Sequence, residues 1–122
     1  MKQILLAEDD PQIARLIQFK LQRAGFSVTW VENGEEALHR LRSLPFDLVI
    51  LDVMMPVKDG FSVLAELKAD ARLHKLPVMM LTARANESDL LKGFQQGATD
   101  YIAKPFDLDH FVERVRAIVE SR

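Results

Sequence analysis

The chain has 122 residues, a length that suits one domain with its own hydrophobic core. Hydrophobic residues make up 48% of it and cysteine is absent, which argues against disorder and excludes disulfides, thiol nucleophiles and cysteine metal sites. The formal net charge of −2 indicates no general attraction to nucleic acid or to an anionic membrane. No apolar run has the length of a membrane span or of a signal-peptide core, so we expect a cytoplasmic protein.

Five short apolar runs predict five β-strands. They are Ile4–Ala7, Phe26–Val31, Leu48–Leu51, Val78–Leu81 and Tyr101–Ala103. The first, third and fourth runs are apolar at every position, which is typical of strands in the middle of a parallel sheet that is covered on both faces.

Apolar stripes at helical spacing follow the runs and predict five helices. The first stripe is Ile13, Leu16, Ile17, Leu21 and Ala24, with Asp10 as N-cap, Pro11 as first helical residue and Gly25 as stop. The others are Ala37–Leu38–Leu41, Phe61–Leu64–Leu67, Leu90–Leu91–Phe94 before Gly97, and Phe111–Val112–Val115–Ile118–Val119 after the N-cap Asp107. Strands that alternate with helices predict an α/β fold with an open, doubly wound parallel sheet, because a closed barrel usually needs eight such units.

Polar side chains stand at the carboxyl ends of the predicted strands, where open α/β sheets bind their ligands. They are Glu8, Asp9 and Asp10 after the first strand, Asp52 after the third, Thr82 after the fourth and Lys104 after the fifth. Each has an ordinary alternative. Asp10 and Thr82 suit helix N-caps, and Asp52 could cap the turn that follows it. Glu8 and Asp9 could be solvated loop charges, and Lys104 a surface charge. Four strand ends that converge on one place are harder to explain in this way, and they indicate a site.

The chemistry of this set favours a hard cation and a phosphoryl group. Carboxylates that lie close together repel unless they are protonated or neutralised, and oxygen ligands suit Mg²⁺. We expect Asp9 and Asp52 to bind Mg²⁺ directly, and Glu8 directly or through water. An aspartate can act as the nucleophile in phosphoryl transfer, while Lys104 offsets charge on the phosphoryl oxygens and Thr82 donates a hydrogen bond to one of them.

Over essentially its whole length the chain resembles the receiver domains of two-component response regulators. The matching stretches are Ile4–Asp10, Asp47–Pro56 with Asp59-Gly60, Leu81–Ala83 and Gly97–Phe106. The resemblance implies a flavodoxin-like, three-layer fold over residues 1–122 with strand order 2-1-3-4-5. It also implies a regulatory phosphoacceptor domain rather than an enzyme.

Residue roles follow from the resemblance. It implies that Asp52 is the phosphoacceptor and that Glu8 and Asp9 are the acidic pair. The Met54 backbone carbonyl would be a further ligand of Mg²⁺, for which Mn²⁺ could substitute. Thr82 and Lys104 would contact the phosphoryl group, and the Lys104–Pro105 bond would be cis. Tyr101 would be an aromatic switch that turns inward, with a plain half-buried strand residue as the alternative. Met54 cannot position an attacking water well, so we expect slow autodephosphorylation.

The implied partners are a sensor histidine kinase or a phosphotransfer protein, which would donate from a phosphohistidine. His39, His74 and His110 are expected to have surface or packing roles, and Trp30 is expected to be a packing or partly exposed residue. The output face would be helix four, strand five and helix five, which is also the candidate surface for a homodimer. Asp100 and Arg114 match one dimer ion pair of winged-helix regulators, whereas Leu90 and His110 replace another. The chain could be a stand-alone regulator or the receiver of a longer protein with a fused output domain, and no residue here suggests direct binding to nucleic acid.

Three alternatives stay open. A haloacid-dehalogenase-type phosphatase also uses an aspartate nucleophile and Mg²⁺, but Met54 stands where its second aspartate is usual. A pseudo-receiver scaffold is disfavoured by the complete set of site residues. A flavodoxin-like cofactor carrier would need a hydroxyl-rich loop where this chain has Glu8-Asp9-Asp10.

Overall fold

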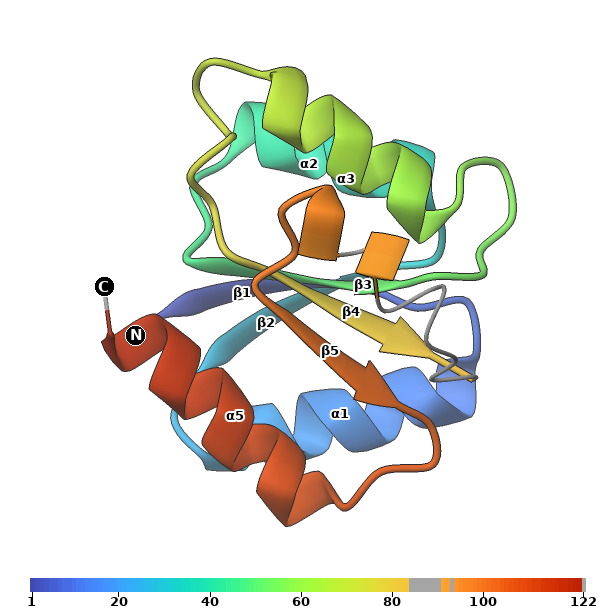
Figure 1. Cartoon of the computed structure of the whole chain (residues 1–122). Helices are drawn as coiled ribbons and strands as arrows, with labels where there is room; N and C mark the ends of the chain where they lie inside the picture. The colour runs from blue at the N-terminus through green and yellow to red at the C-terminus, as the bar shows by residue number, and fades with distance from the viewer. Residues whose placement is uncertain (84–90, 93, 122) are drawn as a thin grey trace.

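The computed structural model describes residues 1–83, 91–92 and 94–121. Its five strands form one parallel sheet in the order β2-β1-β3-β4-β5 (Figure 1). The strands are β1 (Gln3–Ala7), β2 (Ser27–Val31), β3 (Leu48–Asp52), β4 (Val78–Thr82) and β5 (Asp100–Ala103). The predicted α/β class and the strand order implied by the resemblance are therefore confirmed.

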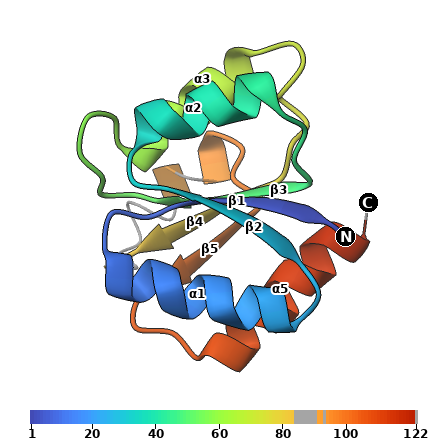
Figure 2. The same ribbon diagram turned by 180° about the vertical axis from the view of Figure 1, so that it is seen from behind.

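Helices cover both faces of the sheet and make the three layers. Helices α2 (Gly34–Ser43) and α3 (Gly60–Ala69) lie on one face, and α1 (Pro11–Arg23) and α5 (Leu108–Glu120) lie on the other (Figures 1 and 2). Residues 91–92 and 94–95 are also helical, whereas Leu90 and Gly93, within the fourth predicted helix, lie outside the described residues. No helix in the described ranges is both long and apolar enough to cross a membrane.

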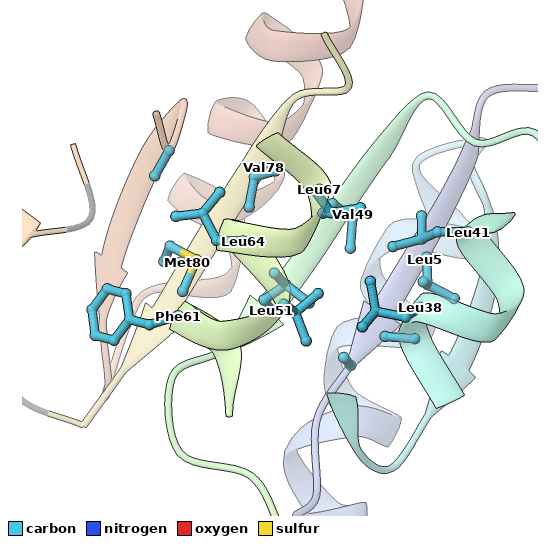
Figure 3. Packing of buried hydrophobic residues seen from close by; sticks show 14 of the residues in the cluster. Leu5, Leu38, Leu41, Val49, Leu51, Phe61, Leu64, Leu67, Val78 and Met80 are labelled. Atoms are coloured by element: carbon cyan, nitrogen blue, oxygen red, sulfur yellow. The ribbon is translucent and has the colours of Figure 1, made fainter. Parts of the chain in front are cut away.

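The core consists of two apolar clusters separated by the sheet. Successive strand residues point to opposite faces, so Leu5 joins the cluster under α2 and α3, and Leu6 joins the cluster under α1 and α5. Figure 3 shows the first cluster, in which Leu38 and Leu64 cover the sheet. Each fully buried leucine contributes about 1.5–3 kcal/mol to folding. Burial on both faces explains why the middle strands are apolar throughout.

Capping aspartates begin the two helices on the α1/α5 face, as predicted. The Asp10 carboxylate accepts hydrogen bonds from the N–H groups of Gln12 and Ile13. Asp107 caps α5 in the same way. Such caps satisfy N–H groups that have no partner within the helix, which fixes where each helix starts. Asp10 therefore has the structural role that its position suggested.

The end of α1 corrects one predicted boundary. The Gly25 N–H donates to the Gln22 carbonyl, the Phe26 N–H donates to the Leu21 carbonyl, and Gly25 has a φ of +95°. This is the Schellman motif that glycine favours at a helix end. Phe26 therefore belongs to the helix stop and packs under it, and β2 begins one residue later than predicted, at Ser27.

The structure also shows how exposed Leu16, Trp30 and the three histidines are. Leu16 lies 55% exposed, although its helical spacing put it in the buried stripe of α1. It borders a surface hollow beside Pro105 and Phe106 instead of the core. Trp30 is partly buried against the α1/α5 cluster, within the expectation of a packing or partly exposed residue. His39, His74 and His110 are exposed, which is the surface alternative of the two roles expected for them.

Candidate metal and phosphoryl site at the strand ends

Three carboxylates meet where β1 and β3 end. The strands pair with Ala7 opposite Leu51, so Glu8 and Asp52 are the next residues along each strand. Oxygen atoms of Glu8, Asp9 and Asp52 all lie within 4.8 Å of one another. Glu8 and Asp52 are buried and Asp9 is exposed. The predicted convergence of these strand ends is present in the structure.

Lys104 reaches the same place from the end of β5. Its Nζ donates to Asp52 Oδ2 over 2.9 Å and lies 2.7 Å from Glu8 Oε1. The contact with Glu8 is off the axis of a hydrogen bond, so it is an ion pair rather than an aligned bond. The Lys104 N–H donates to the Thr82 carbonyl over 2.6 Å, and the Lys104–Pro105 bond is cis. Lys104 therefore joins the fourth and fifth strand ends to the acidic cluster.

Burial makes the charge of this cluster unfavourable. Burial, with the hydrogen bond and negative charge of Asp52, raises the pKa of Glu8 from 4.5 to about 8, although Lys104 acts against this. Burial alone would lower the pKa of Lys104, but its contacts with the Glu8 and Asp52 carboxylates raise it overall. Within the described residues, Lys104 is the one cation paired with these carboxylates. Three oxygen donors with a deficit of positive charge fit a hard divalent cation, so the cluster suits a metal site.

The β3–α3 connection brings the backbone of Gly60 close to that of Asp52. A Cβ atom at Gly60 would lie 2.4 Å from the Asp52 carbonyl oxygen, so a side chain cannot fit there. Asp59 caps α3, and its carboxylate accepts from the Ser62 N–H over 2.8 Å. The Asp59-Gly60 pair noted in the sequence therefore begins α3 and lets it start against the end of β3.

The other predicted site residues surround the carboxylates. Thr82 ends β4 and is buried, one position beyond Leu81, which pairs with Asp52. Met54 follows β3 with 72% of its surface exposed, and its N–H donates to Asp52 Oδ1 over 3.3 Å. Tyr101 is buried on β5, with its ring centre 6.4 Å from that of Phe94. The buried position of Tyr101 is the inward one.

Sequence reasoning missed how the Glu8 backbone is held. The Trp30 indole Nε1 donates to the Glu8 carbonyl oxygen over 2.8 Å. The Glu8 N–H donates to the Val31 carbonyl over 3.1 Å, and Glu8 Oε2 accepts from the Asp10 N–H over 3.1 Å. No local pattern reports the Trp30 bond, because it joins residues on different strands through their register.

Asp100 and Arg114 form a bidentate ion pair within the chain. Arg114 Nε donates to Asp100 Oδ2 over 2.7 Å, and the second guanidinium nitrogen contacts Asp100 Oδ1. Another Arg114 nitrogen lies 3.3 Å from His110 Nε2. The resemblance implied a role for Asp100 and Arg114 between two chains, so a dimer that uses them would have to share or open this pair.

Comparison with known proteins agrees with this geometry. The profile of the response regulator receiver domain matches residues 4–116. The chain is 45% identical to the transcriptional activator protein IrlR of Burkholderia pseudomallei over 95% of its length, covering 49% of that protein. It is 44% identical to the transcriptional regulatory protein CpxR of Escherichia coli over 98% of its length, covering 50% of that protein. The chain thus spans about half the length of the curated relatives it matches.

Solved structures show the same fold. A putative response regulator from Chloroflexus aurantiacus superposes with a TM-score of 0.92 at 34% identity, covering 98% of each chain. The phosphorylated cyanobacterial phytochrome response regulator RcpA gives 0.85 at 35% identity, covering 98% of this chain and 91% of that one. The Mn²⁺-bound response regulator Rcp1 gives 0.83 at 30% identity, covering 97% and 91%.

The open sheet with an acidic cluster at its switch point defines a receiver-type signalling domain. The chain belongs to the response regulator receiver domain family of two-component signalling. Its curated relatives are transcriptional regulators, and the family is regulatory rather than catalytic.

Proposed function

We propose that this receiver domain is switched by phosphorylation of Asp52, with a sensor histidine kinase or a phosphotransfer protein as donor. One observation carries the proposal. The Asp52 carboxylate is buried within 4.8 Å of two other carboxylates and is hydrogen-bonded by the Lys104 ammonium. A nucleophile, a set of metal-binding oxygens and a cation for phosphoryl charge are therefore present together.

Phosphoryl transfer to Asp52 would use residues that already meet at this site. An oxygen of Asp52 forms a bond to phosphorus while the phosphorus–nitrogen bond of the donor phosphohistidine breaks, and the donor imidazole leaves. The Lys104 ammonium would shift its contact from the Asp52 carboxylate to the phosphoryl oxygens, whose negative charge it would offset. The Thr82 hydroxyl would donate a hydrogen bond to one of these oxygens. Mg²⁺, or Mn²⁺ in its place, held by Glu8, Asp9, Asp52 and the Met54 carbonyl, would supply further positive charge.

The surface next to Lys104, which is hydrogen-bonded to Asp52, suits contact with a donor protein. A hollow of about 330 Å³ lies against Lys104 and is lined mainly by apolar side chains of α1 and the β5–α5 connection. Leu16 at its edge is 55% exposed. Exposed apolar surface beside a reactive group is typical of a protein interaction site. The phosphohistidine would reach Asp52 from this side.

The response would run from Thr82 to the output face. Once Thr82 donates to the phosphoryl group, Tyr101 on the adjacent strand would be held in the buried, inward position that it has here. This would change the face formed by helix four, β5 and α5, through which we propose homodimerisation. The curated relatives are transcriptional regulators of about twice the length, so we also propose an output domain fused to residues 1–122.

A turnover phosphatase is a weaker candidate because Met54 offers no acid or base two residues after Asp52. Beryllofluoride, which mimics an aspartyl phosphate, distinguishes the switch from a passive scaffold. With Mg²⁺ it should shift the amide resonances of Thr82, Tyr101 and Lys104, and it should shift none of them in Asp52→Asn. Unchanged wild-type resonances would contradict the proposal.

A further inference from the structure

Glu8 is held by a side chain that lies outside the acidic cluster. Trp30 is on the edge strand β2, where it stands opposite Leu6 of β1 in the register. Its indole Nε1 reaches past the end of β1 and donates to the Glu8 carbonyl oxygen over 2.8 Å. The Glu8 N–H donates to the Val31 carbonyl over 3.1 Å. Both backbone polar groups of Glu8 are therefore bonded to β2.

This arrangement fixes the direction of the peptide that joins Glu8 to Asp9. A peptide group is planar, so a bond to the Glu8 carbonyl also orients the Asp9 N–H and Cα. Asp9 is exposed and its carboxylate belongs to the cluster, whereas Glu8 is fully buried in it. The orientation of this one peptide therefore decides whether the two adjacent carboxylates converge on Asp52.

We propose that Trp30 is a positioning residue for the metal site, acting through its indole N–H on the Glu8–Asp9 peptide. The inference rests on the proposed Mg²⁺ site. Groups that orient metal ligands typically contribute about 10- to 100-fold to metal affinity. We expect a value near the lower end, about tenfold, because the Val31 bond to Glu8 remains when the indole is lost.

Trp30 is also the one tryptophan of the chain, so its signal is unambiguous. The indole N–H resonance of the wild-type protein should move as Mg²⁺ is added. It should saturate at the same Mg²⁺ concentration as the Asp52 amide, because both report one binding event. This measurement needs no substitution and so does not depend on a variant that folds.

The matched variants are Trp30→Phe and Val28→Ala. Phe keeps an aromatic ring against the α1/α5 cluster but has no N–H donor. Val28 lies on the same strand and packs against the same cluster, without contact to Glu8 among the described bonds. Thermal unfolding measures the packing loss in each variant, and amide-shift titration measures the affinity for Mg²⁺.

We expect Trp30→Phe to bind Mg²⁺ about tenfold more weakly, while Val28→Ala loses stability and keeps the wild-type affinity. Equal affinity in wild type and Trp30→Phe, or an indole resonance that does not move while the Asp52 amide does, would overturn the role of Trp30 and leave the metal site standing. If no wild-type amide responds to Mg²⁺, both the metal site and the role of Trp30 fall.

Discussion

Lys104 and Asp52 are joined by a hydrogen bond of 2.9 Å between Nζ and Oδ2, so the Lys104 ammonium contacts the carboxylate that is proposed to react. The same ammonium lies 2.7 Å from Glu8 Oε1. In this state Lys104 offsets part of the negative charge of the cluster.

Replacing Lys104 with methionine should destabilise the metal-free fold. The substitution keeps the length of the side chain but leaves Glu8 and Asp52 buried without their cation, which we expect to cost about 1–3 kcal/mol. Mg²⁺ should restore part of the loss, because it brings positive charge to the same carboxylates. Chemical denaturation with and without Mg²⁺ measures both effects.

The matched control is Lys20→Met. Lys20 pairs with Asp109 over 3.0 Å on the surface, where the Asp109 side chain is 83% exposed. Such surface pairs contribute at most about 1 kcal/mol, and Mg²⁺ should not change the result. A loss in Lys104→Met no larger than in the control would contradict the charge-balance account of the site.

Glu8 should make the stability of the metal-free protein depend on pH. Its pKa is raised from 4.5 to about 8, so between these values the folded state holds a proton that the unfolded chain has released. The stabilisation from this proton is complete below pH 4.5 and is lost as the pH rises through about 8. Glu8→Gln has no carboxyl proton to lose between these pH values, so the free energy of unfolding should fall less steeply with pH in this variant. An unchanged slope in the variant would show that other groups cause it.

The sequence predicted the parts of the fold that depend on local patterns. The alternation of strands and helices, the caps at Asp10 and Asp107 and the stop at Gly25 depend on neighbours in the chain, and the structure has them. The meeting of Glu8, Asp9 and Asp52 followed because parallel strands end at one edge of the sheet. Phe26 was placed wrongly because an apolar residue next to a strand can equally be the one that follows the glycine of a Schellman motif and packs under the helix end.

Contacts that depend on strand register or on elements distant in the chain could not be predicted from the sequence. The bond from Trp30 to the Glu8 carbonyl needs the pairing of β1 with β2, and no spacing encodes it. Arg114 was matched to Asp100 by resemblance, but only the structure shows the pair closing within one chain. Leu16 has ideal helical spacing for the core, yet the β5–α5 connection does not extend far enough to cover it.

Met54 should give the aspartyl phosphate a lifetime of minutes or longer. Its side chain is exposed beside Asp52 and has no group that orients an attacking water well. Met54→Asn should shorten the lifetime about tenfold, less than the effect of a complete general base. The dephosphorylation rates of the wild type and of Met54→Asn are measured by following the loss of the phosphoryl mass by mass spectrometry after the donor is removed. Loss within seconds in the unassisted wild type would contradict the prediction.

Arg114 should matter for a dimer of the activated domain. We expect beryllofluoride with Mg²⁺ to raise the dimer fraction in sedimentation, and Arg114→Ala to reduce that rise. Arg116→Ala is the control on the same helix, since Arg116 donates to the Ala24 carbonyl over 3.2 Å at the α1 end. A wild-type sedimentation profile that beryllofluoride does not change would exclude this dimer.

The most direct test of the central claim is the intact mass of the protein after incubation with Mg²⁺ and acetyl phosphate. The account predicts a mass increase of one phosphoryl group in the wild type, and none in Asp52→Asn or when the metal is chelated. Asp9 is exposed beside Asp52, so Asp9→Asn should reduce the yield by weakening the metal site while leaving the acceptor in place. An unmodified wild-type protein, or equal labelling of Asp52→Asn, would contradict the assignment of Asp52 as phosphoacceptor.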